Sequence, residues 1–292
     1  MVQRQRTIWL AVLLLGLLAT VLHAQVYRGL FNGTCIDDAY ISFRYAENLA
    51  HGHGLVFNVG ERVEGYSNFL WVMLLAPFVL LQDDISQTAS FLGLLFGLLA
   101  LVAAARGLRQ VLGVTSPWAL ALMLSLVAGS GYYAAWCISG LETGLYALLL
   151  TSAWAVYATA KSSSRWLLAA VVFALLALTR PEGVVFGAAA ATLLVFSRAP
   201  AQRRWLFPVV LVLLVLAYHA WRMSWFGWHF MPNSVEAKTG GGVHQLWRGL
   251  RYLTGNFLLP YLPLLAAVVL LKRTNRPTGS ALGLLMVALY LA

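Results

Sequence analysis

Charged side chains are scarce in this 292-residue sequence. Asp, Glu, Lys and Arg together make up 10% of the residues, and apolar types make up 61%. A soluble domain carries about 25% charged residues, because its surface must face water. The composition therefore excludes an ordinary soluble domain and indicates an integral membrane protein whose side chains face lipid or other helices.

Several motifs of well-known enzyme classes are also lacking. There is no G-x-x-x-x-G-K-[ST] loop and no G-x-G-x-x-G loop, so the sequence gives no indication of a bound nucleotide. Cys35 and Cys137 are the two cysteines, and neither a C-x-x-C pair nor an H-E-x-x-H helix is present. A zinc or redox motif is therefore not indicated. We interpret the two cysteines as unrelated, with a disulfide between them as the alternative.

Acidic residues are half as frequent as basic ones, 10 against 20, which gives a net charge of +10. The basic residues gather in short segments at 106–109, 161–165, 198–204 and 272–276. Short basic segments between apolar stretches are typical of the cytoplasmic side of membrane proteins. They are not interleaved with aromatic residues, so we expect no nucleic-acid partner.

Apolar stretches of spanning length predict an all-α, polytopic transmembrane helix bundle with about nine or ten spans. The first stretch has a basic start like a signal peptide, but Leu22 occupies a position where cleavage needs a small residue, so we expect a retained helix. The sequence stops inside the last stretch, so we expect residues 1–292 to be the N-terminal catalytic module of a longer protein. The stretches lie near 8–27, 66–82, 88–105, 117–134, 143–160, 166–179, 182–197, 205–226 and 252–271, with a tenth from about 279.

The order of the charged segments leaves a conflict in topology. Basic residues at the N-terminus place it in the cytoplasm, so the segment at 28–65 is predicted to be the first extracytoplasmic loop. Reaching the basic segment at 106–109 then requires an odd number of crossings, yet two apolar stretches intervene. Either 66–82 or 88–105 is therefore re-entrant or interfacial, or the rule fails locally.

The loop at 28–65 concentrates the charge that the rest of the chain lacks. Its stretch CIDDAYISFRYAENLAHGHG, at 35–54, has apolar and polar residues on opposite helical faces, and Gly52 and Gly54 end the pattern. The apolar face holds Ile41, Tyr45 and Leu49, and the polar face holds Arg44, Asn48 and His51. We predict an amphipathic helix on the membrane surface with Asp37 and Asp38 at its N-terminus.

The acidic pair has two interpretations of equal weight. One aspartate is sufficient to cap the helix and to complement its dipole. Carboxylates at a membrane surface also act as bases toward hydroxyl groups, or orient a phosphate through a divalent cation. If a divalent cation is bound, Asp37 and Asp38 are its candidate ligands; no other cofactor is expected.

Polar residues at other loop–helix junctions on the predicted outer side complete a candidate cavity. Acids and proline are common at helix starts for structural reasons. However, ionisable residues close to membrane depth are functional candidates by default. The candidates for binding the substrate and its phosphate are Arg44, Glu64, Asn68, Glu142, Arg180, Glu182, Asn233 and Lys238.

Four stretches carry a family resemblance: DDAYISFRYAENLAHGHGLVFNVGERVEGYSNFLW, SGLET, LTRPEG and PNSVEAK. Together they resemble the GT-C class of membrane glycosyltransferases, most closely its arabinofuranosyltransferase-like branch, over most of the chain from about residue 35 to 240. The long first stretch is specific, whereas SGLET and RPEG alone are weak. The resemblance implies a multi-pass protein of a bacterial-type inner membrane with its active site on the extracytoplasmic face.

The resemblance also implies the reaction. The donor is a polyprenyl-phosphate-linked sugar, and the acceptor is a cell-envelope glycan, a glycolipid or a protein. The acidic pair of the first outer loop lies at the reaction centre, and this role carries over to Asp37 and Asp38. One of them accepts the proton of the acceptor hydroxyl, while Arg44, Arg180 or Lys238 stabilises the leaving lipid phosphate.

Two other function classes stay open. A flippase of lipid-linked glycans shares the apolar composition and the polar cavity, and a scaffold for envelope assembly needs neither chemistry nor transport. Transporters tend to carry charges in the middle of their helices. The candidate charges here are expected at loop–helix junctions on one side, which favours one-sided chemistry.

Overall fold

The computed structural model describes residues 2–30, 35–81, 84–114, 130–197, 201–227 and 242–252, with the single positions 33, 116, 127, 128 and 254. Helices are the only regular secondary structure in these parts of the chain, which confirms the predicted all-α class. The helices are α1 (Val2–Leu30), α2 (Asp37–Ala50), α3 (Phe69–Val79), α4 (Ile85–Val111), α6 (Gly131–Cys137), α7 (Thr143–Thr159), α8 (Ser163–Thr179), α9 (Glu182–Val195), α10 (Ala201–Phe226) and α12 (Gly242–Tyr252).

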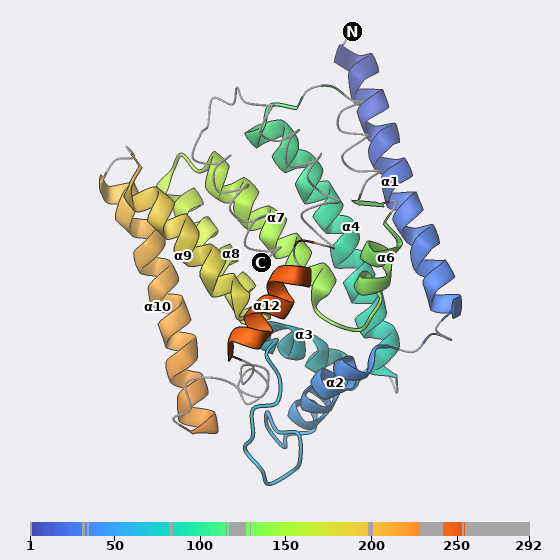
Figure 1. Ribbon diagram of the computed structural model, residues 1–292, viewed down its shortest axis with the longest axis vertical. Coiled ribbons are helices and arrows are strands. Elements are labelled where there is room, and N and C mark those ends of the chain that lie inside the picture. The colour runs from blue at the N-terminus through green and yellow to red at the C-terminus, as the bar shows by residue number, and fades with distance from the viewer. Residues whose placement is uncertain are drawn as a thin grey trace.

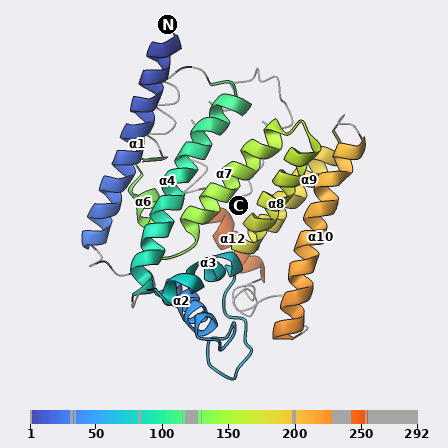
Figure 2. The same cartoon turned by 180° about the vertical axis from the view of Figure 1, so that it is seen from behind.

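The longer helices run side by side in one bundle (Figures 1 and 2). Among the described helices, three are long and apolar enough to cross a membrane: α1 through Leu13–Leu30, α4, and α10 through Trp205–Phe226. Their outer faces expose large apolar side chains such as Leu15 and Leu213, at 66% and 60%. These faces suit lipid rather than water, so the chain is a polytopic membrane protein.

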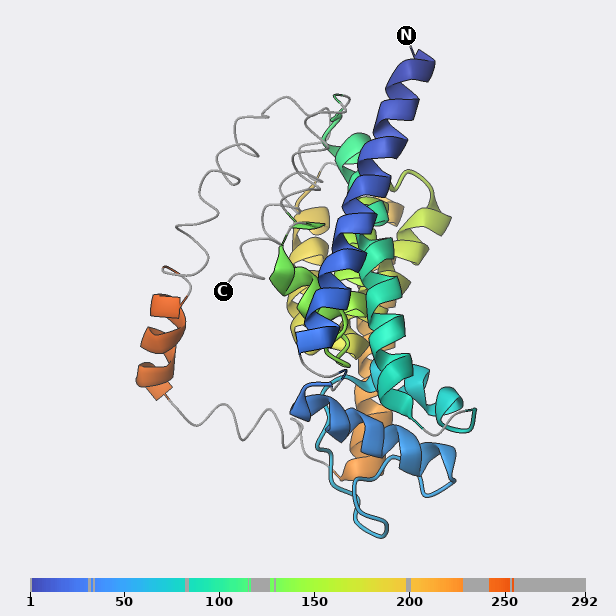
Figure 3. The same ribbon diagram turned by 90° about the vertical axis from the view of Figure 1, so that its right-hand side faces the viewer.

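Two short helices, α2 and α3, lie across one end of this bundle (Figures 1 and 3). At 11 residues α3 is about 16 Å long, about half the thickness of a hydrocarbon core. The chain then enters α4 from the same end. The apolar stretch at 66–82 is therefore not a crossing, and this removes the conflict in the predicted topology.

The basic segments within the described residues lie at the opposite end of the bundle from α2, whereas 272–276 lies outside those residues. The N-terminus of α1, the C-terminal end of α4 with Arg109, and the α7–α8 connection all lie there (Figure 1). The connections at 138–142 and 180–181 lie at the α2 end, as does the C-terminus of α10. The alternation of basic and non-basic segments thus follows the positive-inside pattern once α3 is taken out of the count.

The remaining predicted spans divide into two groups. Helices α7 to α10 confirm that four of them are helical within a few residues, and among these four α10 is long and apolar enough to cross a membrane. Most of the stretch at 117–134, and those at 252–271 and beyond 279, lie outside the described residues. In Figure 3, α12 stands apart from the bundle.

Small residues bring α4 and α7 into close contact. A Cβ atom added to Gly93 or Gly144 would collide with backbone of the facing segment, so only glycine allows this approach. Cys137, at the end of α6, packs against Gly97, and both Cys137 and Cys35 are free and buried, so the two cysteines are unrelated as predicted. This contact fixes the position of the start of α7, where a predicted site residue lies.

Labelling of single cysteines tests whether α3 crosses the membrane. Val59 and Leu81 flank α3 and are 60% and 76% exposed. We expect Val59→Cys and Leu81→Cys to react with a membrane-impermeant maleimide from the same side, and Lys161→Cys only from the other. Wild type, with its two buried cysteines, is the unlabelled control. Reaction of the first two variants from opposite sides would restore 66–82 as a span.

Candidate active site

The acidic pair stands in the first turn of α2. Ile36 is the N-cap residue, and no side chain caps the helix there. Asp37 Oδ1 accepts a hydrogen bond from the backbone N–H of Asp38 at 3.0 Å, so the Asp37 carboxylate bonds the first turn of α2 without being its N-cap. The Asp38 carboxylate has no hydrogen bond or ion pair with any described residue, and both side chains are exposed.

The helical register separates the two aspartates. Asp37 belongs to the exposed stripe that continues through Tyr40 and Arg44. Asp38 shares a face with Ser42, which is buried and lies four residues further along the helix. Side chains at this spacing are neighbours, about 5–6 Å apart at Cβ. Asp38 is therefore the aspartate that lies on the Ser42 side of α2, although its own side chain is exposed.

One prediction about α2 is wrong. Asn48 does not belong to an exposed polar face, because it is buried, 3% exposed. Its Nδ2 donates hydrogen bonds to the carbonyl oxygens of Val56 and Phe57, at 2.7 and 2.9 Å. Asn48 thus ties the following loop to the helix, and α2 packs on α3 and the bundle end as well as presenting one face outward.

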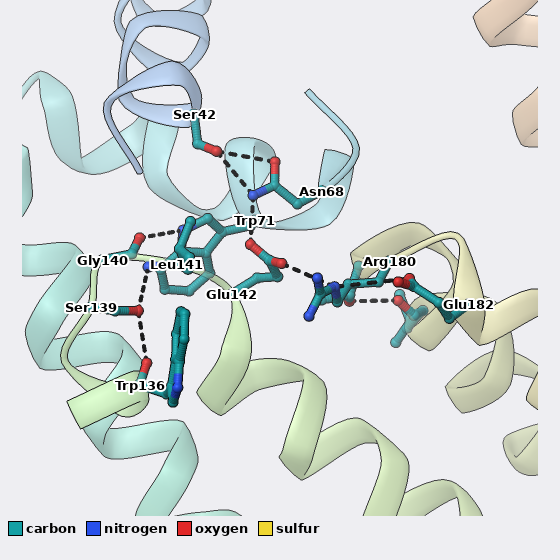
Figure 4. A network of polar contacts seen from close by, with 12 residues as sticks. Ser42, Asn68, Trp71, Trp136, Ser139, Gly140, Leu141, Glu142, Arg180 and Glu182 are labelled. Carbon is teal, nitrogen blue, oxygen red and sulfur yellow. Dashed lines mark hydrogen bonds and ion pairs between the residues drawn. The ribbon is translucent and has the colours of Figure 1, made fainter. Parts of the chain in front are cut away.

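Ser42 begins a polar network that joins four of the predicted site residues (Figure 4). Asn68 Nδ2 donates to Ser42 Oγ at 2.9 Å and to Glu142 Oε2 at 2.7 Å. Arg180 Nε lies 3.3 Å from Glu142 Oε1 and 3.9 Å from Glu182 Oε2. Residues from three loops, far apart in sequence, therefore meet beside the first two turns of α2.

Three members of the network are positioned by the end of a helix. Asn68 and Glu142 are the N-cap residues of α3 and α7, and Arg180 is the C-cap residue of α8. Trp71 Nε1 donates to the carbonyl of Gly140 at 3.0 Å, which holds the SGLET segment against α3. The Glu142 side chain is 7% exposed, whereas that of Arg180 is 40% exposed. The network is thus buried at Glu142 and open to a ligand at Arg180.

Glu64 lies in a second cluster. Its Oε2 accepts a hydrogen bond from Arg222 Nη1 at 2.7 Å, and the two side chains are 6% and 2% exposed. Burial raises the pKa of the Glu64 carboxyl from 4.5 to about 7, although the Arg222 guanidinium acts in the opposite direction. The pair joins the loop before α3 to the last turns of α10, across 158 positions of sequence.

Aromatic rings surround this ion pair. Tyr66 packs on Phe69 and Phe226, and Phe69 packs on Tyr218 and Trp221. Their low polarity explains the raised Glu64 pKa, because charge is poorly solvated there. Sequence analysis missed Arg222, although an arginine inside the apolar stretch at 205–226 is itself an indication of a functional or structural partner.

The other predicted residues lie elsewhere. Arg44 is exposed, pairs with Glu47 at 2.8 Å, and donates from Nε to the Phe57 carbonyl at 3.2 Å. It therefore belongs to the outward stripe of α2 and not to the network. Asn233 and Lys238 lie outside the described residues.

A divalent cation fits the acidic pair in part. One or two exposed carboxylates are enough for Mg²⁺, which usually keeps waters and takes further oxygens from a substrate phosphate. In the described parts of the chain, no group of three or more His, Cys, Asp or Glu side chains forms a closed metal site. Because the two side chains point about 100° apart, either Asp37 or Asp38, and not both, would supply a carboxylate to such an ion, which would help to bind the donor phosphate.

Two curated proteins are similar to this chain. Both are named terminal β-(1→2)-arabinofuranosyltransferase. The protein from Mycobacterium tuberculosis is 30% identical over 266 residues, which cover 83% of this chain and 42% of that protein. The protein from Corynebacterium glutamicum is 30% identical over 261 residues, which cover 74% of this chain and 37% of that protein.

The chain is arabinofuranosyltransferase-like. The family resemblance read from its motifs is confirmed at this level. The arabinofuranosyltransferase-like chain spans 42% and 37% of the lengths of these two relatives. No family model and no solved structure matches it.

The Asn68 amide tests the network. Asn68→Ala removes a donor to the buried Glu142 carboxylate and is expected to lower the free energy of unfolding by about 1–3 kcal/mol. Asn58→Ala is the matched control, because the exposed Asn58 bonds only Glu61 in the same loop, and its effect should stay within about 0.5 kcal/mol. Unfolding in detergent micelles measures both, and equal effects would contradict the network's role.

The Glu64–Arg222 pair is expected to show a pH dependence of definite sign. The folded protein keeps a proton on Glu64 that the unfolded chain releases above about pH 4.5, so this contribution to stability falls as the pH rises from 4.5 to about 7. Arg222→Leu removes the cation that lowers this pKa. The free energy of unfolding of this variant should therefore keep falling above pH 7, and at pH 8 it should be about 3–5 kcal/mol below that of wild type.

Glu64→Gln is the control for this titration. It removes the Glu64 carboxyl and leaves Arg222 in place, so the variant should show the smallest change in stability between pH 5 and pH 8. Thermal unfolding of wild type and both variants across this range measures the slopes. Parallel slopes in all three proteins would show that Glu64 does not titrate there.

Proposed function

We propose that this chain is the catalytic module of a membrane glycosyltransferase of the GT-C type. It transfers an arabinofuranosyl residue from a polyprenyl-phosphate donor to a cell-envelope glycan, glycolipid or protein on the extracytoplasmic face of a bacterial-type inner membrane. The observation that carries the proposal is the exposed Asp37–Asp38 pair beside the network of Asn68, Glu142 and Arg180. Similarity to the two arabinofuranosyltransferases supports the reaction class and the sugar.

The reaction is a displacement at the anomeric carbon of the donor sugar. The oxygen of an acceptor hydroxyl forms the new bond to this carbon, and the bond from the carbon to the phosphate oxygen breaks. Polyprenyl phosphate leaves with the electron pair, and a carboxylate takes the hydroxyl proton. Asp38 is the better base, because its carboxylate is not engaged by described residues and lies on the Ser42 face.

The network would orient the acceptor beside this base. Arg180 is shared between the carboxylates of Glu142 and Glu182, and its exposed part offers donors for sugar hydroxyls. The face of Tyr146 lies 5.8 Å from its guanidinium carbon and limits its movement. Asn233 and Lys238 remain predicted substrate-binding residues.

The position of the charges supports chemistry on one side of the membrane over transport. The acidic pair, the network and the Glu64–Arg222 pair all lie at the α2 end of the bundle. A flippase would need polar contacts along its path, and a scaffold would need no exposed acid pair. We assign the α2 end to the extracytoplasmic side because the described basic segments lie at the opposite end of the bundle.

Transfer of radiolabelled arabinofuranose in proteoliposomes tests the function. With a polyprenyl-phosphate arabinofuranose donor and an arabinan fragment as acceptor, we expect Asp38→Asn to lower kcat by about 10²- to 10⁴-fold. Asp37→Asn should have a smaller effect, because its carboxylate already bonds a backbone N–H.

Glu61→Gln is the matched control, an exposed carboxylate of the loop that follows α2, and should retain wild-type transfer. Thermal unfolding confirms that each variant is folded. Full transfer by folded Asp38→Asn and Asp37→Asn would make the pair structural. No transfer by wild type, together with movement of the labelled lipid between leaflets, would support the flippase.

A further inference from the structure

A groove between α1, α4 and α6 opens beside the first turn of α2. Its cavity is about 340 Å³, and none of the predicted site residues lines it. Phe91 and Leu94 of α4 and Trp136 of α6 form an apolar wall. Phe91 and Trp136 are 65% and 44% exposed, so the groove is open on the lipid-facing side of the bundle.

The other end of this groove is polar and carries a positive charge. Gln25 and Arg28, from the last turns of α1, line it together with Ser139. An apolar channel that ends in a cation matches an amphipathic ligand with one long apolar chain and an anionic head.

The Arg28 guanidinium is available for such a head group. It makes no hydrogen bond or ion pair with any described residue, whereas three of the other described arginines at this end pair with carboxylates. Arg44 pairs with Glu47, Arg180 with Glu142, and Arg222 with Glu64, while Arg62 lies over the Trp225 ring. An arginine in the last turn of a helix also complements the helix dipole, which needs no ligand. The experiments must therefore distinguish the two roles.

A second cavity connects the groove to the acidic helix. It measures about 720 Å³, shares Gln25, Arg28 and Gly33 with the first, and extends to Tyr40. Tyr40 belongs to the exposed stripe of Asp37. Asp84 also lines this cavity, but its carboxylate accepts hydrogen bonds from Ser86 and Gln87 at the start of α4. A head group at Arg28 would thus point a further substituent toward the first turn of α2.

We propose that this groove binds the polyprenyl-phosphate donor, with the isoprenoid chain along Phe91 and Trp136 and the phosphate at Arg28. The inference rests on the proposed function and adds a binding site on the α1 side of α2, away from the Asn68–Glu142–Arg180 network. The sugar of the bound donor occupies the second cavity, next to Asp37. The anomeric carbon of the sugar and the acceptor hydroxyl then meet at the first turn of α2, where the displacement takes place.

Photocrosslinking tests the occupant directly. Phe91→p-benzoylphenylalanine, in the full chain in proteoliposomes, is expected to capture tritiated polyprenyl phosphate. Val185→p-benzoylphenylalanine is the control, because Val185 is 51% exposed on α9, away from the groove. Excess unlabelled polyprenyl phosphate should abolish capture, whereas polyprenol without phosphate and phosphatidylglycerol should not. Equal capture at both positions, or displacement by phosphatidylglycerol, would show ordinary boundary lipid and overturn the proposal.

The second experiment isolates the cation. Arg28→Gln is expected to raise KM for the donor about tenfold with little change in kcat, and to lower capture at position 91 by a similar factor. Arg28→Lys should restore part of both. Arg165→Gln removes the same charge at the other end of the bundle, where Arg165 bonds Thr159, and should change neither value.

The outcomes separate this site from the proposed function. Specific capture at Phe91 without any sugar transfer by wild type would retain the lipid site and refute the transferase. Transfer with an unchanged KM in Arg28→Gln and no specific capture would retain the transferase and refute the groove. A loss of thermal stability in Arg28→Gln with no shift in KM would assign Arg28 to the helix dipole alone.

Discussion

The contact between Glu64 and Arg222 is the interaction on which the polar end of this protein depends. It fastens the loop between α2 and α3 to the last turns of α10, and both side chains are almost completely buried. A buried ion pair contributes little stability compared with apolar residues, but removal of one partner is costly. Its effect is therefore to specify one placement of the loop. The loop in turn carries Asn68, which reaches Glu142 and Ser42.

The bilayer explains why all these groups lie at one end. Polar side chains and irregular backbone are stable only where water or protein satisfies them. Short helices α2 and α3 close the end of the bundle, and the loops between longer helices supply caps that are also polar side chains. Structural capping and the assembly of a site are thus not alternatives here. Glu142 and Arg180 occupy the cap positions of α7 and α8, and their side chains form the network.

Much of this arrangement could be predicted from the sequence. Apolar stretches predicted α4 and α7 to α10, and the junction positions of Asn68, Glu142, Arg180 and Glu182 predicted a shared polar region. The stretch at 66–82 was one of two candidates for a non-crossing element, and the choice stayed open because its composition resembles that of a span and only tertiary packing shows the short length of α3. Asn48 was predicted on an exposed face. Helical periodicity alone does not show that the loop after α2 folds back over this face and buries it. Arg222 was overlooked because its partner is distant in sequence.

The first turn of α2 faces two different environments, and this accounts for two adjacent aspartates. Successive residues of a helix point about 100° apart, so one carboxylate cannot serve both sides. Asp37 shares its stripe with Tyr40, which lines the cavity that reaches Arg28, while Asp38 shares its face with Ser42, which belongs to the network. A transferase must bring a lipid-linked sugar from the membrane to a hydroxyl that comes from water. A helix across the bundle end, with an acid on each side of its first turn, places both reactants against one short segment of backbone.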